Sequence, residues 1–146
     1  MPDRKRSRSL LAALTASGMV RLRKIPPLHA PKTDGRLLGT WRSDKRRTLK
    51  EWAFKPGLAR RHRQRFRGIF GRLKITYTRR RIHSVLGRWR YAGQYHVIGR
   101  DANSVAIMYW DVLCQEWQIE HIHFDGKDSY WVSVGWNREF FRRVRR

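Results

Sequence analysis

The fold is decided by residues 116–134, which read EWQIEHIHFDGKDSYWVSV. The residues from Glu116 to Phe124 read as a strand, in which successive side chains point to opposite sides: Trp117, Ile119, His121 and His123 share one side, and Gln118, Glu120, Ile122 and Phe124 share the other. Asp125-Gly126 is a hairpin signal, because glycine tolerates the positive φ that a tight turn requires. A second strand-like run begins at Ser129 and continues to the end of the stretch. These residues therefore predict two antiparallel strands joined by a short loop.

Similar patterns occur on both sides of this stretch. Strand-like segments separated by turn residues cover 37–41, 73–77, 91–98, 104–110 and 140–144. With the hairpin they make about seven strands, one before residue 44 and the others after residue 70. Because the connections are short, an antiparallel meander is favoured. The expected fold class is mostly β, with the meander forming an open or closed small barrel.

A basic helical segment interrupts the strands at residues 44–70. Apolar residues recur at helical spacing on both sides of Pro56-Gly57, which breaks the segment in two. Ser43 or Asp44 can cap the first helix by accepting a hydrogen bond from a free backbone N–H. We expect this segment as an insertion after the first strand of the β-domain.

Composition indicates a small folded domain with an uneven charge. The chain has 146 residues, 34 Lys and Arg against 11 Asp and Glu, and 12% aromatic residues, which a disordered basic tail would lack. Residues 37–100 hold 19 basic and 2 acidic residues, whereas residues 101–146 hold 6 and 7. This asymmetry predicts a basic face that attracts phosphates or anionic lipid, although an Arg-rich solvated surface is the simpler alternative. The single cysteine, Cys114, excludes an intrachain disulfide and a multi-cysteine zinc site, and no apolar run is long enough to cross a bilayer.

Residues 1–35 are expected to be a basic, disordered extension, with the β-domain covering residues 36–146. The apolar stretch from Leu10 to Val20 follows a basic start and has the outline of a secretory signal, with Ala16-Ser17-Gly18 before a cleavage point. The basic residues at 21–24 oppose export. A cytoplasmic location is therefore preferred, and export by this weak signal is the alternative.

Gly39-Thr40-Trp41 carries a resemblance to a known family. A Gly-x-Trp on the first strand, short antiparallel strands and a basic residue on the last strand resemble the barrels of lipocalins and related calycins, over residues 37–144. In that family the Trp packs across the barrel floor, with an Arg from the last strand against it. The resemblance implies these places for Trp41 and for Arg142 or Arg143. Short bacterial lipocalin-like domains fit this length best.

Two features depart from the family pattern. The basic helical segment lies between the first and second strands, and the strands after it are too few for an eight-stranded barrel. Closure of the barrel therefore stays open. The resemblance implies a noncatalytic protein that binds a small apolar or aromatic ligand by burying apolar area. The candidate ligand-binding residues are Trp41, Tyr77, Tyr95, Tyr109, Trp117 and Trp131.

The basic segments support a second interpretation, a nucleic-acid-binding protein. Arg side chains bind phosphates through two nitrogens and stack on bases, and Arg-rich helices bind RNA. The alternative for the helix is an amphipathic element that packs on the sheet while its Arg stems cover the rim. Nucleic-acid binding requires one continuous face formed by Arg60, Arg61, Arg63, Arg67, Lys74, Arg79, Arg80 and Arg81.

Metal and catalytic chemistry have less support in the sequence. His121 and His123 share one side of a strand and could bind zinc or copper with His96 or Cys114 as a third ligand, but histidines among aromatic residues more commonly pack there. Glu116 and Glu120 share the other side of that strand and are expected to be solvated. No catalytic, phosphate-cradling or dinucleotide motif occurs, so we expect neither an enzyme nor a cofactor.

Overall fold

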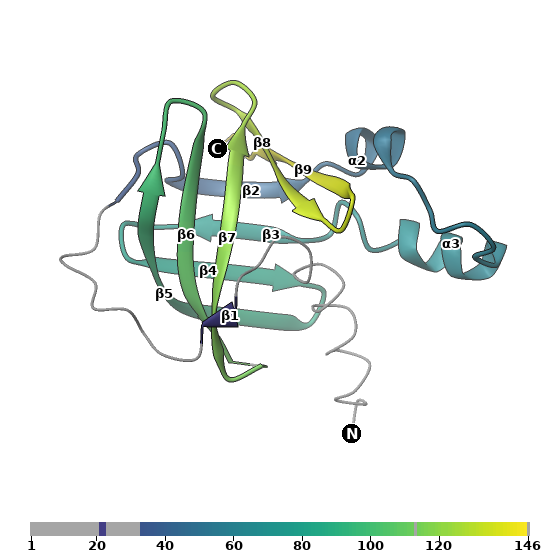
Figure 1. Cartoon of the computed structure of the whole chain (residues 1–146), viewed down its shortest axis with the longest axis horizontal. Coiled ribbons are helices and arrows are strands. Elements are labelled where there is room, and N and C mark those ends of the chain that lie inside the picture. Colours follow the sequence, from purple (N-terminus) through teal and green to yellow (C-terminus); the bar gives the residue numbers. More distant parts are fainter. Residues whose placement is uncertain (1–20, 23–32, 113, 146) are drawn as a thin grey trace.

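The computed structural model describes residues 21–22, 33–112 and 114–145. Figure 1 shows the arrangement of the strands and helices in these ranges. Two helices, α2 (Lys45–Glu51) and α3 (Arg60–Arg67), lie between the second and third strands. The strands are β1 (Arg21–Leu22), β2 (Gly39–Ser43), β3 (Lys74–Tyr77), β4 (Arg81–Leu86), β5 (Trp89–Arg100), β6 (Ser104–Asp111), β7 (Glu116–Phe124), β8 (Ser129–Val134) and β9 (Asn137–Arg143).

Strands β2 to β9 form a closed, antiparallel, eight-stranded barrel. Each of these strands pairs with the next one along the chain, and β9 pairs with β2 to complete the ring. The pairing of β7 with β8 is short and joins His123 to Trp131 and Phe124 to Tyr130. The expected mostly-β meander is confirmed, as is the helical segment after the first barrel strand. Closure of the barrel, which the sequence leaves open, is settled by the β2–β9 and β7–β8 pairs.

The barrel has one strand more than the sequence pattern predicts, and that strand is β4. In the second half of β4 a polar side chain faces the interior and an apolar one faces outward: Ser84 is buried, whereas Val85 is on the outer side and partly exposed. Gly87, with φ +60°, then makes the tight turn into β5. The expectation of too few strands for an eight-stranded barrel is therefore wrong. With a serine at an inward-facing position, β4 lacks the alternation of apolar and polar residues by which a strand is predicted.

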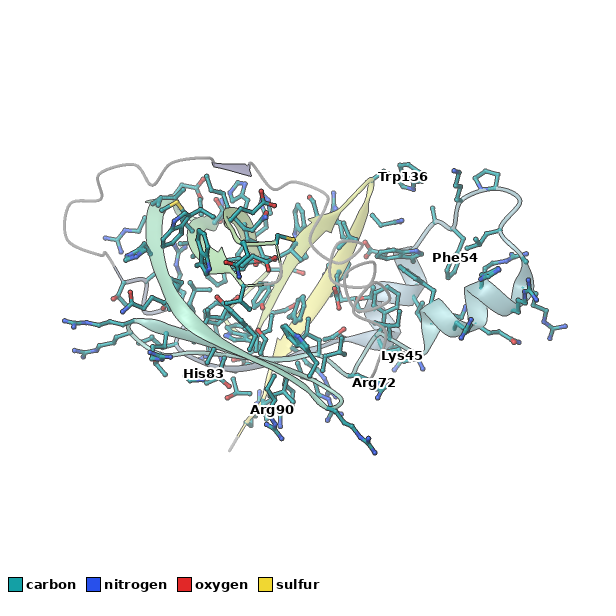
Figure 2. All side chains as sticks on the ribbon, turned by 90° about the horizontal axis from the view of Figure 1, so that it is seen from below. Lys45, Phe54, Arg72, His83, Arg90 and Trp136 are labelled. Carbon is teal, nitrogen blue, oxygen red and sulfur yellow. The ribbon has the colours of Figure 1, made fainter. Side chains whose placement is uncertain are left out.

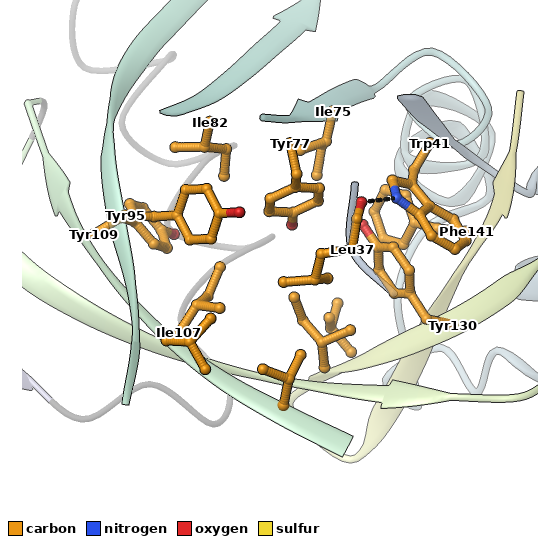
Figure 3. Packing of buried hydrophobic residues seen from close by; sticks show 14 of the residues in the cluster. Leu37, Trp41, Ile75, Tyr77, Ile82, Tyr95, Ile107, Tyr109, Tyr130 and Phe141 are labelled. Atoms are coloured by element: carbon orange, nitrogen blue, oxygen red, sulfur yellow. Dashed lines mark hydrogen bonds between the residues drawn. The ribbon is translucent and has the colours of Figure 1, made fainter. Parts of the chain in front are cut away.

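The core consists of side chains at alternate positions of each strand. On β8, Tyr130 and Val132 are buried, whereas their neighbours point to the outer face. Figure 3 shows the packed interior, where Trp41 meets the edge of Tyr130 with ring centroids 4.7 Å apart. Tyr77 meets the edge of Tyr95 at 5.6 Å. These rings fill the half of the barrel around Trp41.

Trp41 closes one end of the barrel. Its indole Nε1 donates to the Leu37 carbonyl at 2.8 Å, and the guanidinium of Arg143 lies over its ring, 4.2 Å from the centroid. Arg143 also donates to the Leu38 carbonyl at 2.6 Å. The side chain on Trp41 is therefore that of Arg143, whereas Arg142 is exposed on the outer face.

Gly39 is required at this closed end. Its φ of +120° is unfavourable for any residue with a side chain. A Cβ at this position would also lie 2.9 Å from a guanidinium nitrogen of Arg143. The glycine of the Gly-x-Trp sequence thus makes room for the arginine that covers the tryptophan.

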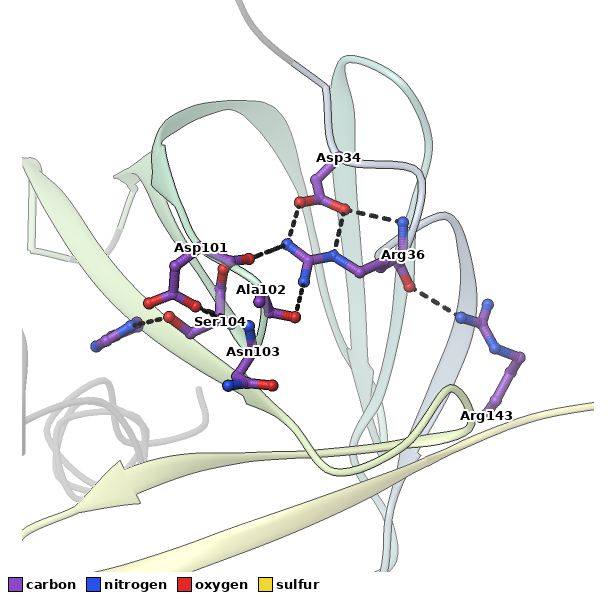
Figure 4. A network of polar contacts seen from close by, with 8 residues as sticks. Asp34, Arg36, Asp101, Ala102, Asn103, Ser104 and Arg143 are labelled. Atoms are coloured by element: carbon purple, nitrogen blue, oxygen red, sulfur yellow. Dashed lines mark hydrogen bonds and ion pairs between the residues drawn. The ribbon is translucent and has the colours of Figure 1, made fainter.

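A polar network at the same end ties the turn before β2 to the loop between β5 and β6 (Figure 4). Asp34 is 2% exposed and forms an ion pair with Arg36 at 2.7 Å. The hydrogen bond from Arg36 is the main reason why the pKa of Asp34 lies below its usual value. Arg36 also donates to the carbonyls of Ala102 at 2.8 Å and Asp101 at 3.0 Å.

Most of the predicted extension at residues 1–35 lies outside the described residues, and so does the signal-like stretch from Leu10 to Val20. Arg21 and Leu22 form β1, which pairs antiparallel with Gln118 and Trp117 of β7. Thr33 donates to the Arg79 carbonyl at 3.1 Å. Contacts with the barrel therefore begin upstream of residue 36.

The expected helical segment at 44–70 consists of two short helices separated by residues 52–59. Asp44 caps α2 by accepting from the Arg47 N–H at 3.1 Å. The buried Thr48 hydroxyl accepts from the Phe140 N–H at 2.9 Å, which fixes α2 on β9. In Figure 1, α3 projects beyond the barrel. Neither described helix has the length and apolarity needed to span a membrane.

Candidate functional site

A cavity of about 70 Å³ lies inside the barrel. Four polar side chains reach it: Ser84, Asp111, Glu120 and Glu139. The remaining wall is apolar or aromatic and comes from the segment before β3 and from strands β3 to β6, β8 and β9. It consists of Leu73, Ile75, Ile82, Leu86, Trp89, Tyr91, Tyr109, Val132 and Phe141.

The cavity opens at the end of the barrel opposite the turn that Arg36 anchors. Leu73, Leu86 and Trp89 lie at strand ends there, and all three are partly exposed. Leu86 and Trp89 face each other across the turn from β4 to β5. We call these three side chains the mouth of the cavity.

Glu139 reaches the cavity from β9 and is 2% exposed. The Ser43 hydroxyl donates to its Oε1 at 2.7 Å and itself accepts from the Gly71 N–H at 3.0 Å. Burial raises the pKa of Glu139 to about 7, against the lowering effect of the Ser43 hydrogen bond. The charge of Glu120 adds a smaller upward shift. Glu139 is therefore close to half-protonated at neutral pH.

Glu120 reaches the same cavity from the middle of β7. Its carboxyl group lies among protein atoms, and the residue is partly exposed. Burial raises the pKa of Glu120 to about 7. Within the described part of the chain, the structure gives this carboxyl group no hydrogen bond and no ion pair.

The other titratable groups around the cavity are acids and phenols. Burial raises the pKa of Tyr91 to about 12, with a smaller contribution from the charge of Asp111. Burial likewise raises the pKa of Tyr109 well above its usual value. Both phenols are therefore neutral at pH 7. Among the described residues, no Lys, Arg or His lines the cavity.

The six aromatic candidates from the sequence occupy three different environments. Tyr109 lines the cavity. Trp41, Tyr77 and Tyr95 belong to the packed core. Trp117 and Trp131 lie on the outer face, where Trp131 stacks on His123 with ring centroids 3.9 Å apart. Successive side chains on a strand point to opposite faces, so the position along the strand, rather than aromatic character, decides which side chains reach the interior.

Neither cavity glutamate, Glu120 or Glu139, is among the site residues predicted from the sequence. The expectation that Glu120 is solvated is wrong, because Glu120 has the same parity on β7 as the buried Gln118 and Ile122. That parity is visible in the sequence and could have placed Glu120 inside. Glu139 has no comparable signal, because β9 buries three consecutive residues, Glu139 to Phe141.

His121 and His123 lie together on the outer face, with ring centroids 4.0 Å apart. His121 Nε2 is 2.8 Å from the Ser104 hydroxyl. His96 instead packs against Trp117. No three His, Cys, Asp or Glu side chains of the described residues are grouped closely enough to hold a metal ion. The proposed third ligands, His96 and Cys114, are therefore not brought to the histidine pair.

The basic residues predicted to bind nucleic acid are divided between two ends of the molecule. Arg60, Arg61, Arg63 and Arg67 lie on α3, which buries none of its residues. Arg79, Arg80 and Arg81 lie at the turn between β3 and β4, on the other side of the barrel from α3 (Figure 1). Lys74 is exposed on β3.

A different set of basic residues lies close together on the outer face. Arg142 pairs with Arg42 across β9 and β2, and Arg42 pairs with Lys74 across β2 and β3. Figure 2 shows Lys45 and Arg72 beside this part of the barrel. We call the surface depression that Arg42, Lys45, Arg46, Arg72 and Arg142 line the basic hollow. Asp44 also borders it, but its carboxylate caps α2.

No known protein family, curated protein or solved structure matches this chain. Functional conclusions therefore rest on the cavity and on the outer basic surface.

Proposed function

We propose that this chain is a noncatalytic, lipocalin-like protein that binds a small apolar or aromatic ligand inside its barrel. The cavity is the observation that carries the proposal: it is lined mainly by apolar and aromatic side chains, with a few polar groups among them. Ligand sites commonly have this composition, because apolar burial supplies affinity and a few polar groups supply orientation.

The arrangement at the closed end supports the lipocalin-like part of the proposal. Gly39, Trp41 and Arg143 occupy the places that the resemblance implies, with the guanidinium 4.2 Å from the indole centroid. A barrel that is closed at one end and open at the other suits a ligand that enters past the mouth residues.

Filling the cavity tests this proposal. Ser84 lines the cavity and is 8% exposed, whereas Ser133 points outward on β8. Ser84→Leu should abolish binding of benzyl alcohol, indole and benzylamine, measured by calorimetry, and Ser133→Leu should leave it unchanged. If none of the three binds the wild-type protein, or if both variants bind equally well, the proposal is wrong.

A second candidate function is polyanion binding at the basic hollow. Like charges directly opposite each other in a sheet are unfavourable, yet Arg142, Arg42 and Lys74 form such a row. None of the ion pairs among the described residues neutralises this row. A row of cations without acidic partners suits a chain of phosphates.

This candidate has a matched test on the two basic surfaces. Arg42→Gln with Arg142→Gln should weaken binding of a short single-stranded RNA and flatten its salt dependence by about 0.7 log–log slope units per lost contact. The paired control is Arg60→Gln with Arg61→Gln on α3, which should change the slope less. Equal effects of the two pairs, with heparin competing as well as RNA, would indicate nonspecific attraction to a polycation.

A further inference from the structure

The cavity contains Glu120 and Glu139, which have no positive neighbour among the described residues. Both line it, and neither takes part in an ion pair among the residues that the structure describes. Burying an unpaired carboxylate is costly. In a chain with 34 Lys and Arg, one basic residue at a lining position would offset that cost. The missing positive charge therefore points to a cation that comes from outside the chain.

We propose that the cavity binds an organic ammonium ion, with its N–H groups on Glu120 and Glu139 and its carbon skeleton against the aromatic wall. This inference rests on the proposed ligand-binding function and narrows the ligand to an amine. A primary ammonium group offers three N–H donors, and carboxylates are strong acceptors for them.

The lining of the cavity favours an ammonium ion over a metal ion. Trp89, Tyr91 and Phe141 present aromatic rings, which attract organic cations through their faces. Calcium and magnesium ions require about six or more oxygen ligands. The described residues contain no group of three side chains that could begin such a set. An ion with an apolar body therefore fits these walls better.

The dimensions of the cavity limit the shape of the amine. Its volume of about 70 Å³ has room for a few water molecules and is too small to enclose a large ligand. The ammonium group and the first carbons fill this space. A longer body must extend past Leu73, Leu86 and Trp89 at the mouth. The ligand class is thus a slender alkyl or arylalkyl amine.

The net charge of +23 does not prevent an amine from binding inside. None of the described Lys and Arg residues lines the cavity, and salt screens charges outside it over about 8 Å at physiological ionic strength. In the cavity the nearest ionisable side chains are acidic or phenolic. The charge of Glu120 acts on Glu139 of β9 and on the neutral phenols of Tyr77, Tyr109 and Tyr130, and Asp111 and Tyr91 line the same cavity.

Two probes of similar shape test the inference. Benzylamine and benzyl alcohol differ in charge, and their affinities for the full chain can be measured by calorimetry at pH 7.5. We expect benzylamine to bind about tenfold more tightly or better, as charge-assisted hydrogen bonds require. Glu120→Gln should remove most of this preference. Glu51→Gln, at the exposed end of α2, is the matched control and should keep the preference.

The outcomes separate the two levels of the proposal. If both probes bind with equal affinity and Ser84→Leu abolishes both, the ligand-binding function stands and the amine inference is overturned. If neither probe binds the wild-type protein, both proposals fall. If Glu120→Gln and Glu139→Gln leave the preference for benzylamine intact, the amine inference is also wrong.

A measurement on the wild-type protein keeps the test independent of how well the variants fold. Carbon-13 NMR of the carboxyl groups reports the pKa of Glu120 directly. Saturating benzylamine should lower that pKa, because a bound ammonium ion favours the charged carboxylate, whereas benzyl alcohol should not. Unchanged titration of Glu120 in saturating benzylamine would overturn the inference.

Discussion

At the scale of single residues, Glu139 links the cavity to the stability of the barrel. Its pKa is raised from 4.5 to about 7 because the carboxyl group is buried. Between these two values the folded state binds a proton that the unfolded state has released. Folding is therefore favoured by this group below pH 4.5, and the contribution is lost as the pH rises through 7.

The raised pKa of Glu139 predicts how the stability of the protein changes with pH. We expect Glu139 alone to lower the free energy of unfolding between pH 5 and pH 8 by at most about 3 kcal/mol, and Glu120, whose pKa burial also raises to about 7, to act in the same direction. Glu139→Gln carries no titrating carboxyl group and should be more stable than the wild type at pH 8. Urea denaturation at both pH values measures the difference. Comparing the variant with the wild type cancels the contributions of groups that titrate alike in both proteins. His123 is one such group: its pKa is lowered mainly by burial, so its contribution to the free energy of unfolding rises with pH. Identical pH slopes for the two proteins would contradict the prediction.

Gly39 supplies a second prediction at this scale. Gly39→Ala places a Cβ at φ +120° and against Arg143, so it should cost about 1 to 3 kcal/mol of unfolding free energy. Gly35→Ala is a suitable control, because a Cβ there meets nothing within 4 Å. A loss of the same size in both variants, measured by urea denaturation, would show that the close approach of Arg143 is unimportant.

At the scale of elements, one buried hydroxyl group joins α2 to β9. Thr48 accepts from the Phe140 N–H at 2.9 Å, and neither group is open to solvent. Thr48→Val leaves that donor unsatisfied and should cost about 1 to 3 kcal/mol. Thr48→Ser keeps the hydroxyl and should recover most of the loss in a thermal unfolding experiment. If serine and valine are equally destabilising, packing of the methyl group, and not the hydrogen bond, fixes α2.

Most barrel strands could be predicted because runs of β-forming residues are separated by turn residues. The hairpin of β7 and β8 is an example, since Asp125-Gly126 separates two strand-like runs. β4 could not be predicted, because Ser84 faces inward and Val85 outward. Barrel closure was equally inaccessible, since it depends on pairs such as Trp41 with Arg143, which lie far apart in the sequence.

The candidate site was predicted less well than the fold. Aromatic character favours Trp117 and Trp131, yet both face outward, whereas Glu120 and Glu139 face the cavity. A charged residue inside a barrel contradicts the usual preference for apolar interiors. Sequence rules based on that preference therefore overlook the residues that distinguish this cavity.

At the scale of the whole molecule, charge is sorted by location. The chain carries +23, and its basic residues dominate the outer surface and α3, while the cavity walls hold carboxyl groups and no basic residue among those described. Such sorting suits two separate partners: an amine inside the barrel and a polyanion outside it. The two sites need not compete, because they lie on opposite sides of the sheet.

The central claim is that a small ligand enters the barrel cavity, and methyl NMR during a benzylamine titration tests it most directly. The methyl groups of Leu73, Ile75, Ile82, Leu86 and Val132 line the cavity, whereas Ile98 and Val112 are exposed elsewhere. We predict saturable shifts at the cavity-lining methyl groups that are absent in Ser84→Leu. Unchanged cavity methyl signals, or shifts of equal size at Ile98 and Val112, would contradict ligand binding in the barrel.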